Sequence, residues 1–145
     1  MSKGRIVHFE IQADDTERAA KFYREVFEWQ IEKWEGGAMD YWMVMTAEKD
    51  SKELGINGGL LKRPCPAPAA EQGVNAYVCT VGVEDLDAIA EKILAAGGKE
   101  AMPRFDIAGM GWQAYYIDTE GNTFGIHQPN AEWAAKAKEM AAVQQ

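Results

Sequence analysis

The sequence predicts an α+β fold in which two tandem βαβββ modules form a curved, mixed-sheet cleft, followed by a C-terminal helix. Residues 6–15 and 76–85 each read as a strand that leads into an amphipathic helix, and the two segments lie 70 residues apart. Between them, 64–73 contains three prolines within five residues, which indicates a linker because proline cannot donate to a β-ladder. Since a repeated unit commonly buries its apolar face against its own copy, we expect one domain over 1–145.

Module one, over 3–63, opens with alternating apolar and polar residues, a pattern typical of a half-buried strand. Asp14 or Asp15 is expected to cap the next helix, whose apolar residues recur at helical spacing as far as Phe27. A Gly-Gly pair predicts the turn between the two strands that follow. The strands of this module are expected at 5–12, 29–35, 39–47 and 55–62.

Module two, over 74–128, repeats this order. Its helix is expected over 85–96. The Gly-Gly pair at 97–98 is typical of the C-terminal end of a helix. We interpret 118–122 as the turn between the last two strands, and 103–112, which contains two glycines, as a loop. The strands are expected at 75–83, 99–104, 111–118 and 123–128, and an Ala-rich helix at 130–143.

The overall charge excludes several classes of partner. The net charge is −8 at pH 7 and the pI is near 4.8, which argues against binding to nucleic acid or to an anionic membrane. No apolar run is long enough for a transmembrane helix and no secretory signal is visible, so we expect a cytoplasmic protein. Cys65 and Cys79 form no CxxC pair, and we interpret them as reduced thiols.

Several motifs along the chain occur together in one known superfamily. They are His-Phe-Glu-Ile at 8–11, Glu-Arg-Ala-Ala-Lys-Phe-Tyr at 17–23, Gly-Gly-Leu at 58–60, Val-Glu-Asp-Leu-Asp at 83–87 and Asp-Thr-Glu-Gly-Asn-Thr-Phe-Gly-Ile at 118–126. In this combination the chain resembles the vicinal oxygen chelate superfamily of glyoxalases, extradiol dioxygenases and bleomycin-resistance proteins. It looks nearest to a bacterial branch labelled culture-filtrate-antigen-like. The resemblance implies two half-barrels that enclose one ligand cleft, and a homodimer.

The resemblance also implies a divalent metal in that cleft, with ligands from the first and last strand of each module. Carried over by position, the four ligands fall on His8, on about Gly59, on Val78 and on Gly125. Only His8 has a ligating side chain, whereas a catalytic zinc or iron site needs about three protein ligands. We therefore expect no firmly held metal and no other cofactor.

The first strand supplies the candidate catalytic residues. Alternation places His8, Glu10 and Gln12 on one face, which we expect to line the cleft. His8 could accept a proton and Glu10 could orient it, so this pair is the candidate for acid–base chemistry. The alternative is a hydrogen-bonded polar pair within a pocket.

Further residues are candidates for ligand contact. The glycines at the expected metal positions could leave space for a ligand or relieve crowding where the half-barrels meet. Aromatic rings in the strands could stack on a flat or apolar ligand, or pack in the core. The predicted ligand-binding residues are Gln12, Trp42, Gly59, Tyr116, Gly125 and His127.

Three functions remain open from the sequence. The first is a small-molecule-binding protein, or an enzyme without the usual metal, that uses the cleft. The second is a metal-dependent lyase or dioxygenase with displaced ligands His8, Glu10 and His127. The third is a non-enzymatic interaction module that uses the cleft or the helix around Trp133. The sequence names no ligand.

Overall fold

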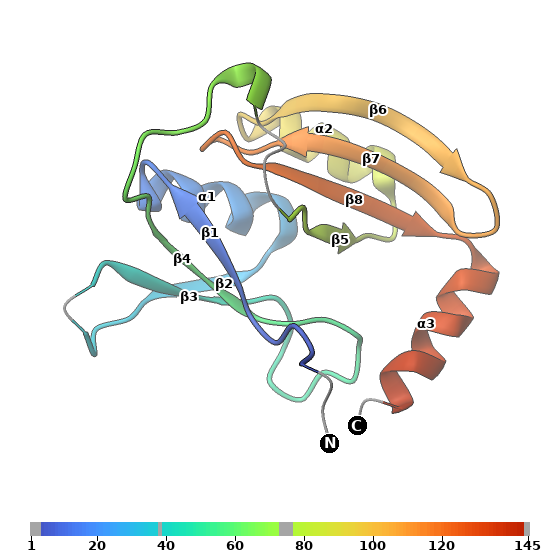
Figure 1. The fold of residues 1–145 in the computed structure, drawn as a ribbon. Helices are drawn as coiled ribbons and strands as arrows, with labels where there is room; N and C mark the ends of the chain where they lie inside the picture. The colour runs from blue at the N-terminus through green and yellow to red at the C-terminus, as the bar shows by residue number, and fades with distance from the viewer. Residues whose placement is uncertain (1–3, 38, 73–76, 144–145) are drawn as a thin grey trace.

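The computed structural model confirms the predicted α+β architecture (Figure 1). It describes residues 4–37, 39–72 and 77–143. Module one comprises β1 (Phe9–Ala13), α1 (Thr16–Phe27), β2 (Gln30–Lys33), β3 (Tyr41–Met45) and β4 (Gly58–Lys62). A short 3₁₀ helix, η1 (Ala70–Gln72), precedes module two, which comprises β5 (Thr80–Gly82), α2 (Leu86–Ala95), β6 (Lys99–Ile107), β7 (Gly111–Ile117) and β8 (Thr123–Pro129). Helix α3 (Ala131–Val143) follows.

Each module forms a four-stranded mixed sheet with the same topology. Sheet one has the order β1-β4-β3-β2 and sheet two has the order β5-β8-β7-β6. The first and last strands of each module pair in parallel, and the other pairs are antiparallel. Glu10 pairs with Gly59 in sheet one, and Thr80, which lies 70 residues after Glu10, pairs with Gly125 in sheet two. The two modules therefore share the pairing register of their parallel strands as well as their topology.

The two main helices begin in the same way. The Asp15 side chain accepts a hydrogen bond from the Arg18 amide at 3.0 Å, and Asp85 accepts from the Ala88 amide at 3.1 Å. These N-caps satisfy amide groups that have no partner within the helix. The choice left open between Asp14 and Asp15 is thereby resolved in favour of Asp15.

One hydrophobic core joins the two modules. Helix α1 presents Phe22, Tyr23 and Val26 toward Leu60 of sheet one and Phe124 of sheet two, and all five are almost fully buried. Phe22 and Phe124 lie edge to face with ring centroids 6.1 Å apart. Because neither module contains this cluster alone, we infer that they fold as one unit.

Most strands of module one are shorter than predicted, and β5, expected at 75–83, spans Thr80–Gly82, with 75–76 outside the described residues. Two of the differences concern residues discussed for function. Strand β1 begins at Phe9 and not at residue 5, so His8 lies just before it. The predicted loop over 103–112 is wrong, because β6 continues to Ile107 and only 108–110 form the turn. Proline 103 is tolerated because β6 is an edge strand whose register with β7 shifts between Met102 and Phe105.

Helix α3 leaves the end of β8 and projects beyond sheet two (Figure 1). Ala141 is buried, whereas Met140 and Val143 are exposed. Among the described residues, no helix is long and apolar enough to span a bilayer.

Candidate ligand-binding hollow between the modules

The modules are joined by the turn 118–122, which lies between β7 and β8 and contacts the start of α1. The buried Tyr23 hydroxyl donates to Asp118 Oδ2 at 2.7 Å. Arg18 donates to both oxygens of the buried Glu120 carboxylate, at 2.7 and 2.9 Å. Asn122 Nδ2 donates to the Gln12 carbonyl oxygen at 2.7 Å. This turn, predicted from the sequence only as a connection, thus fixes module two against α1 and β1.

Burial and hydrogen bonding shift the pKa values of the titratable groups where this turn contacts α1. Burial, together with the nearby Asp118, raises the pKa of the Tyr23 phenol well above its usual value, so Tyr23 stays a donor. Burial also raises the pKa of Asp118, in opposition to its hydrogen bonds from Tyr23 and from backbone amides. Burial alone would raise the pKa of Glu120 as well. The hydrogen bonds from Arg18, from the Asp15 amide and from Thr119 outweigh this effect, so the pKa of Glu120 is lowered.

Arg63, whose side chain is only 6% exposed, connects the same segments from the other side. Its Nη2 donates to the carbonyl oxygens of Gln12 and Glu120 and to Asn122 Oδ1, at 2.9–3.2 Å. Its Nε lies 3.3 Å from an Asp14 oxygen. Because a buried guanidinium needs partners for its donors, these contacts hold the beginning of the linker against both modules.

The polar residues of α1 that hold the turn 118–122 have no polar counterparts on α2. Under the 70-residue repeat, Arg18 corresponds to Ala88 and Tyr23 to Ile93, which have no polar group to receive a turn. The segment of module one that would dock there, 46–57, is bonded to itself through Thr46 and Asn57 and is mostly exposed. A large hollow of about 2690 Å³ remains between the modules at this place, and we call it the inter-module hollow.

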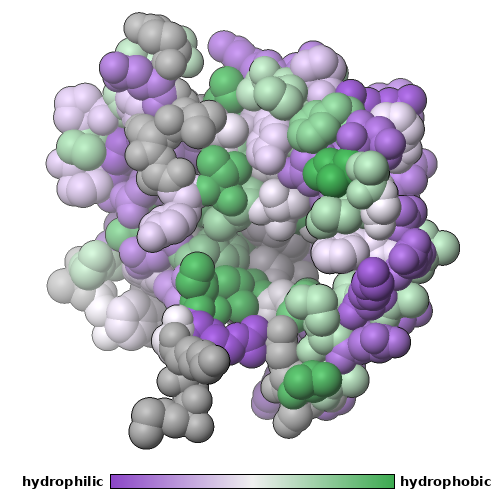
Figure 2. All heavy atoms as spheres, turned by 45° about the vertical axis from the view of Figure 1, so that its right-hand side comes forward, coloured by the Kyte–Doolittle hydropathy of each residue, from purple (hydrophilic) through white to green (hydrophobic). Residues whose placement is uncertain are grey.

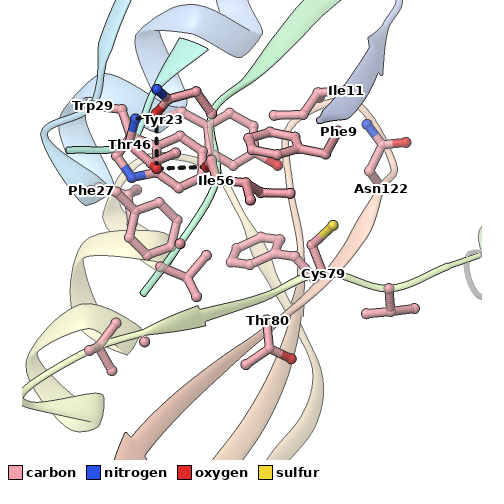
Figure 3. Close-up of a pocket in the computed structure, with 18 of the residues that line it drawn as sticks. Phe9, Ile11, Tyr23, Phe27, Trp29, Thr46, Ile56, Cys79, Thr80 and Asn122 are labelled. Atoms are coloured by element: carbon pink, nitrogen blue, oxygen red, sulfur yellow. Dashed lines mark hydrogen bonds between the residues drawn. The ribbon is translucent and has the colours of Figure 1, made fainter. Parts of the chain in front are cut away.

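The inter-module hollow has apolar walls and a polar rim. Figure 3 shows Trp29, Tyr23 and Phe27 on one side, with Phe9 and Ile11 of β1 beside Tyr23, and Cys79 across from them next to β5. Figure 2 shows hydrophobic side chains gathered around a recess on one face of the molecule. Segment 46–57, the linker residues 63–69 and one side of α3 complete the lining. Its charged lining residues include Glu28, Glu53, Glu84, Lys92 and Lys138.

A polar cluster lies on the face of sheet one that points away from the core. His8 Nε2 and the Tyr41 hydroxyl are 2.7 Å apart, and both residues are accessible. Burial, and then the Glu10 carboxylate, raise the pKa of Tyr41. A Cβ added to Gly59 would overlap this hydroxyl, so the space above Gly59 is filled by Tyr41.

Sheet two carries an equivalent cluster. Gln113 Nε2 donates to Thr80 Oγ1 at 3.2 Å, and Gln113 Oε1 lies 3.1 Å from His127 Nδ1. A Cβ on Gly125 would lie 2.6 Å from both Gln113 Nε2 and Thr80 Oγ1. In both modules, therefore, a neighbouring polar side chain fills the space above the glycine that the sequence suggested for a ligand.

The predicted site residues fall into three groups. Glu10 and Gln12 border the inter-module hollow. His8 and Gly59 lie in the polar cluster of sheet one, and Gly125 and His127 lie in that of sheet two. Trp42 and Tyr116 lie in none of these places: strand alternation turns both side chains toward the core, and neither is among the residues that line the inter-module hollow.

Three residues of the hollow and of the two polar clusters were not predicted as site residues: Tyr41, Gln113 and Trp29. Tyr41 and Gln113 were missed because their positions above the glycines depend on the pairing register of β3 and β7. Trp29 follows directly after α1 and was weighed only as one of many aromatic residues. Its position at the helix end, next to Phe27, could have suggested a ring cluster.

The positions of the implied metal ligands do not fit a metal ion. Gly59, Val78 and Gly125 carry no donor side chain, and the spaces above both glycines are filled. In the described ranges, no three His, Cys, Asp or Glu side chains converge as a metal site would require. His8, Glu10 and His127 are accordingly not assembled into the displaced-ligand set that the sequence left open.

Comparisons with known proteins agree with this fold. A family model described as "Glyoxalase/Bleomycin resistance protein/Dioxygenase superfamily" matches residues 5–126. A protein of Mycobacterium tuberculosis named "Putative glyoxylase CFP32" is 30% identical over 128 residues, which are 83% of this chain and 44% of that protein. This chain thus spans less than half the length of that relative. A "Glyoxylase-like domain-containing protein" of Didymella fabae is 30% identical over 85% of this chain and 92% of its own.

Solved structures share the fold at low identity. The fosfomycin resistance protein FosX of Listeria monocytogenes, in complex with Mn(II), has a TM-score of 0.65 at 16% identity and covers 94% of this chain and 99% of its own. TnmS3, an antibiotic-binding protein from Streptomyces sp. CB03234, has a TM-score of 0.65 at 21% identity, with coverage of 90% and 99%. With the family match over most of its length, the chain belongs to the Glyoxalase/Bleomycin resistance protein/Dioxygenase superfamily.

Proposed function

We propose that this chain binds a small organic molecule in the inter-module hollow and does so without a metal ion at the positions that the superfamily resemblance implies. The observation that carries the proposal is the hollow itself, with aromatic walls and a polar rim. Pockets for drug-sized ligands have volumes of roughly 300–1,000 Å³, so a hollow of about 2690 Å³ has room for such a molecule. The filled spaces above Gly59 and Gly125 favour ligand binding without metal chelation.

The direct test is a thermal-shift screen of the purified chain against a metabolite library and, separately, against Mn²⁺, Ni²⁺, Zn²⁺ and Fe²⁺. A ligand that binds only the folded state raises the melting temperature. We expect stabilisation by one or more organic compounds in the presence of EDTA. Elemental analysis should find less than one metal ion per chain, and His8→Ala should leave that content unchanged. Stoichiometric metal that is lost in His8→Ala would contradict the proposal.

We also propose that two copies of the chain associate. Large apolar side chains are exposed just before two of the four edge strands: Ile6 and Val7 precede β1, and Tyr77, which is 97% exposed, precedes β5. Solvent-exposed apolar residues beside unpaired strand edges favour association with another chain. Sedimentation equilibrium should give twice the chain mass, and the double variant Ile6→Ser/Val7→Ser should shift the population toward one chain. A wild-type chain that sediments as a monomer at micromolar concentration would contradict this.

A further inference from the structure

Arg63 is a mostly buried arginine that leaves part of its hydrogen-bonding capacity unused. Its side chain is only 6% exposed, and Nη2 donates to oxygen atoms of Gln12, Glu120 and Asn122. The contact of Nε with an Asp14 oxygen at 3.3 Å is an ion pair, but it is not aligned as a hydrogen bond. Nη1 donates to no group among the described residues, so both of its N–H groups are unused.

The unused nitrogen of Arg63 is accessible. Within the described part of the chain, the buried polar atoms that lack a hydrogen-bond partner include Arg63 Nε but not Nη1, so Nη1 reaches the protein surface. Arg63 lines the inter-module hollow together with Pro64, Cys65 and Pro66, which follow it along the chain, and Nη1 is the donor that it can offer there. Since Nη1 and the Nε–H group lie on different edges of the planar guanidinium, a group bound to Nη1 leaves the Asp14 contact in place.

The charge and burial of Arg63 favour an anionic oxygen as the partner of Nη1. A guanidinium forms stronger hydrogen bonds to a carboxylate than to a neutral acceptor. Because water screens a mostly buried charge less than a surface charge, Arg63 attracts an anion more strongly than an exposed arginine would. The chain as a whole has a net charge of −8, which disfavours an anion with more than one charge. These properties together favour a monocarboxylate.

We propose that the inter-module hollow binds an apolar monocarboxylic acid, whose carboxylate accepts hydrogen bonds from Arg63 Nη1. This rests on the proposed function, because it names the ligand class and the anchoring residue of the same hollow. The apolar walls of the hollow have room for the remainder of such a molecule. Arg63 then has two roles: Nη2 holds the linker against both modules, and Nη1 binds the ligand.

The probe for this proposal is 4-phenylbutyrate, and its control is 4-phenylbutyramide, which has a similar shape but no charge. Isothermal titration calorimetry of the wild-type chain at pH 7 should show saturable binding of one 4-phenylbutyrate per chain. The amide should bind about tenfold to hundredfold more weakly, the range expected for one hydrogen bond to a charged group. This comparison needs no variant, so it does not depend on whether an altered chain folds.

Arg63→Gln should bind the acid and the amide with similar affinity. Arg18→Gln is the matched control, because it also removes a guanidinium that bonds to the turn 118–122, but Arg18 does not line the hollow. It should keep the preference for the acid, and circular dichroism checks the fold of both variants. Since Arg63→Gln also breaks contacts between the modules, the side-chain ¹⁵Nε–Hε signal of Arg63 in the wild type provides a second measurement. This signal should shift with the acid and not with the amide.

Equal affinity of the wild type for the acid and the amide would overturn the proposal, and so would an Arg63 signal that stays in place at saturation with the acid. A preference for the acid that persists in a folded Arg63→Gln would mean that another group binds the carboxylate, and the assignment of Arg63 would be wrong. If 4-phenylbutyrate does not bind but uncharged metabolites stabilise the chain, the ligand class is wrong and the proposed function stands. If no organic compound binds at all, both are wrong.

Discussion

Replacing Glu120 with glutamine tests whether the turn 118–122 holds the two modules together. The glutamine side chain has the same shape as glutamate, and its oxygen can still accept a hydrogen bond from the Asp15 backbone N–H. Its NH₂ group, however, replaces Glu120 Oε2, which accepts a hydrogen bond from Arg18 Nε at 2.7 Å. Hydrogen bonds to a charged group contribute about 1.5–3 kcal/mol, and the half-exposed Arg18 reduces this through solvent screening, so we expect a loss of about 2 kcal/mol. Urea unfolding at pH 7 with an unchanged m-value measures it.

The matched control is Glu25→Gln, which breaks the exposed Lys21–Glu25 pair on α1 and should cost only about 0.3–0.5 kcal/mol. The pH dependence provides a second check. Because the pKa of Glu120 is lowered in the folded state, its contribution is complete above the ordinary value of 4.5 and is lost as the pH falls through the folded-state pKa. The difference between wild type and Glu120→Gln should therefore shrink in acid. A loss no larger than that of the control, or one that grows in acid, would refute the reasoning.

Three further variants test other contacts. Gly58→Ala should destabilise the chain by about 1–3 kcal/mol, because its methyl group would overlap the Phe9 carbonyl oxygen of the paired strand. Gly55→Ala, with open space around it, should be near neutral, and equal urea midpoints for the two variants would contradict the close approach of β1 and β4. Tyr23→Phe should cost about 1–2 kcal/mol because Asp118 loses a buried donor, and an unchanged urea midpoint would contradict this. Glu28→Gly should raise the free energy of unfolding by about 0.5–1 kcal/mol, since Glu28 ends α1 at φ 60°, and a lower melting temperature would disprove it.

The repeated pattern was sufficient to predict the two modules, their element order and, to within one residue, the N-cap of α1. These features depend on local signals, such as an aspartate before an apolar helical stripe and alternation in short strands. The extension of β6 through Pro103 could not be predicted locally, because it depends on β6 being an edge strand in a particular sheet order. Alternation alone also left open which face of its strand Trp42 or Tyr116 would present to the core.

The inter-module hollow could not be predicted from sequence patterns, for a different reason. It results from the way the modules pack, which depends on contacts more than 90 residues apart, such as Tyr23 with Asp118 and Arg18 with Glu120. The sequence indicated a cleft between the modules, and its predicted residues Glu10 and Gln12 border the hollow. It did not reveal the consequence of Ala88 and Ile93, which lack the polar groups that Arg18 and Tyr23 supply in module one.

The account depends most on where a ligand binds. Chemical-shift mapping on the ¹⁵N-labelled chain, titrated with the strongest compound of the thermal-shift screen, tests this directly. We predict that the largest shifts occur at the Trp29 indole and at the amides of Phe9, Cys79 and Val81, with little change at His8, Tyr41 or Gln113. Shifts concentrated on His8, Tyr41 and Gln113 instead would place the ligand on the opposite faces of the sheets and contradict the assignment of the inter-module hollow.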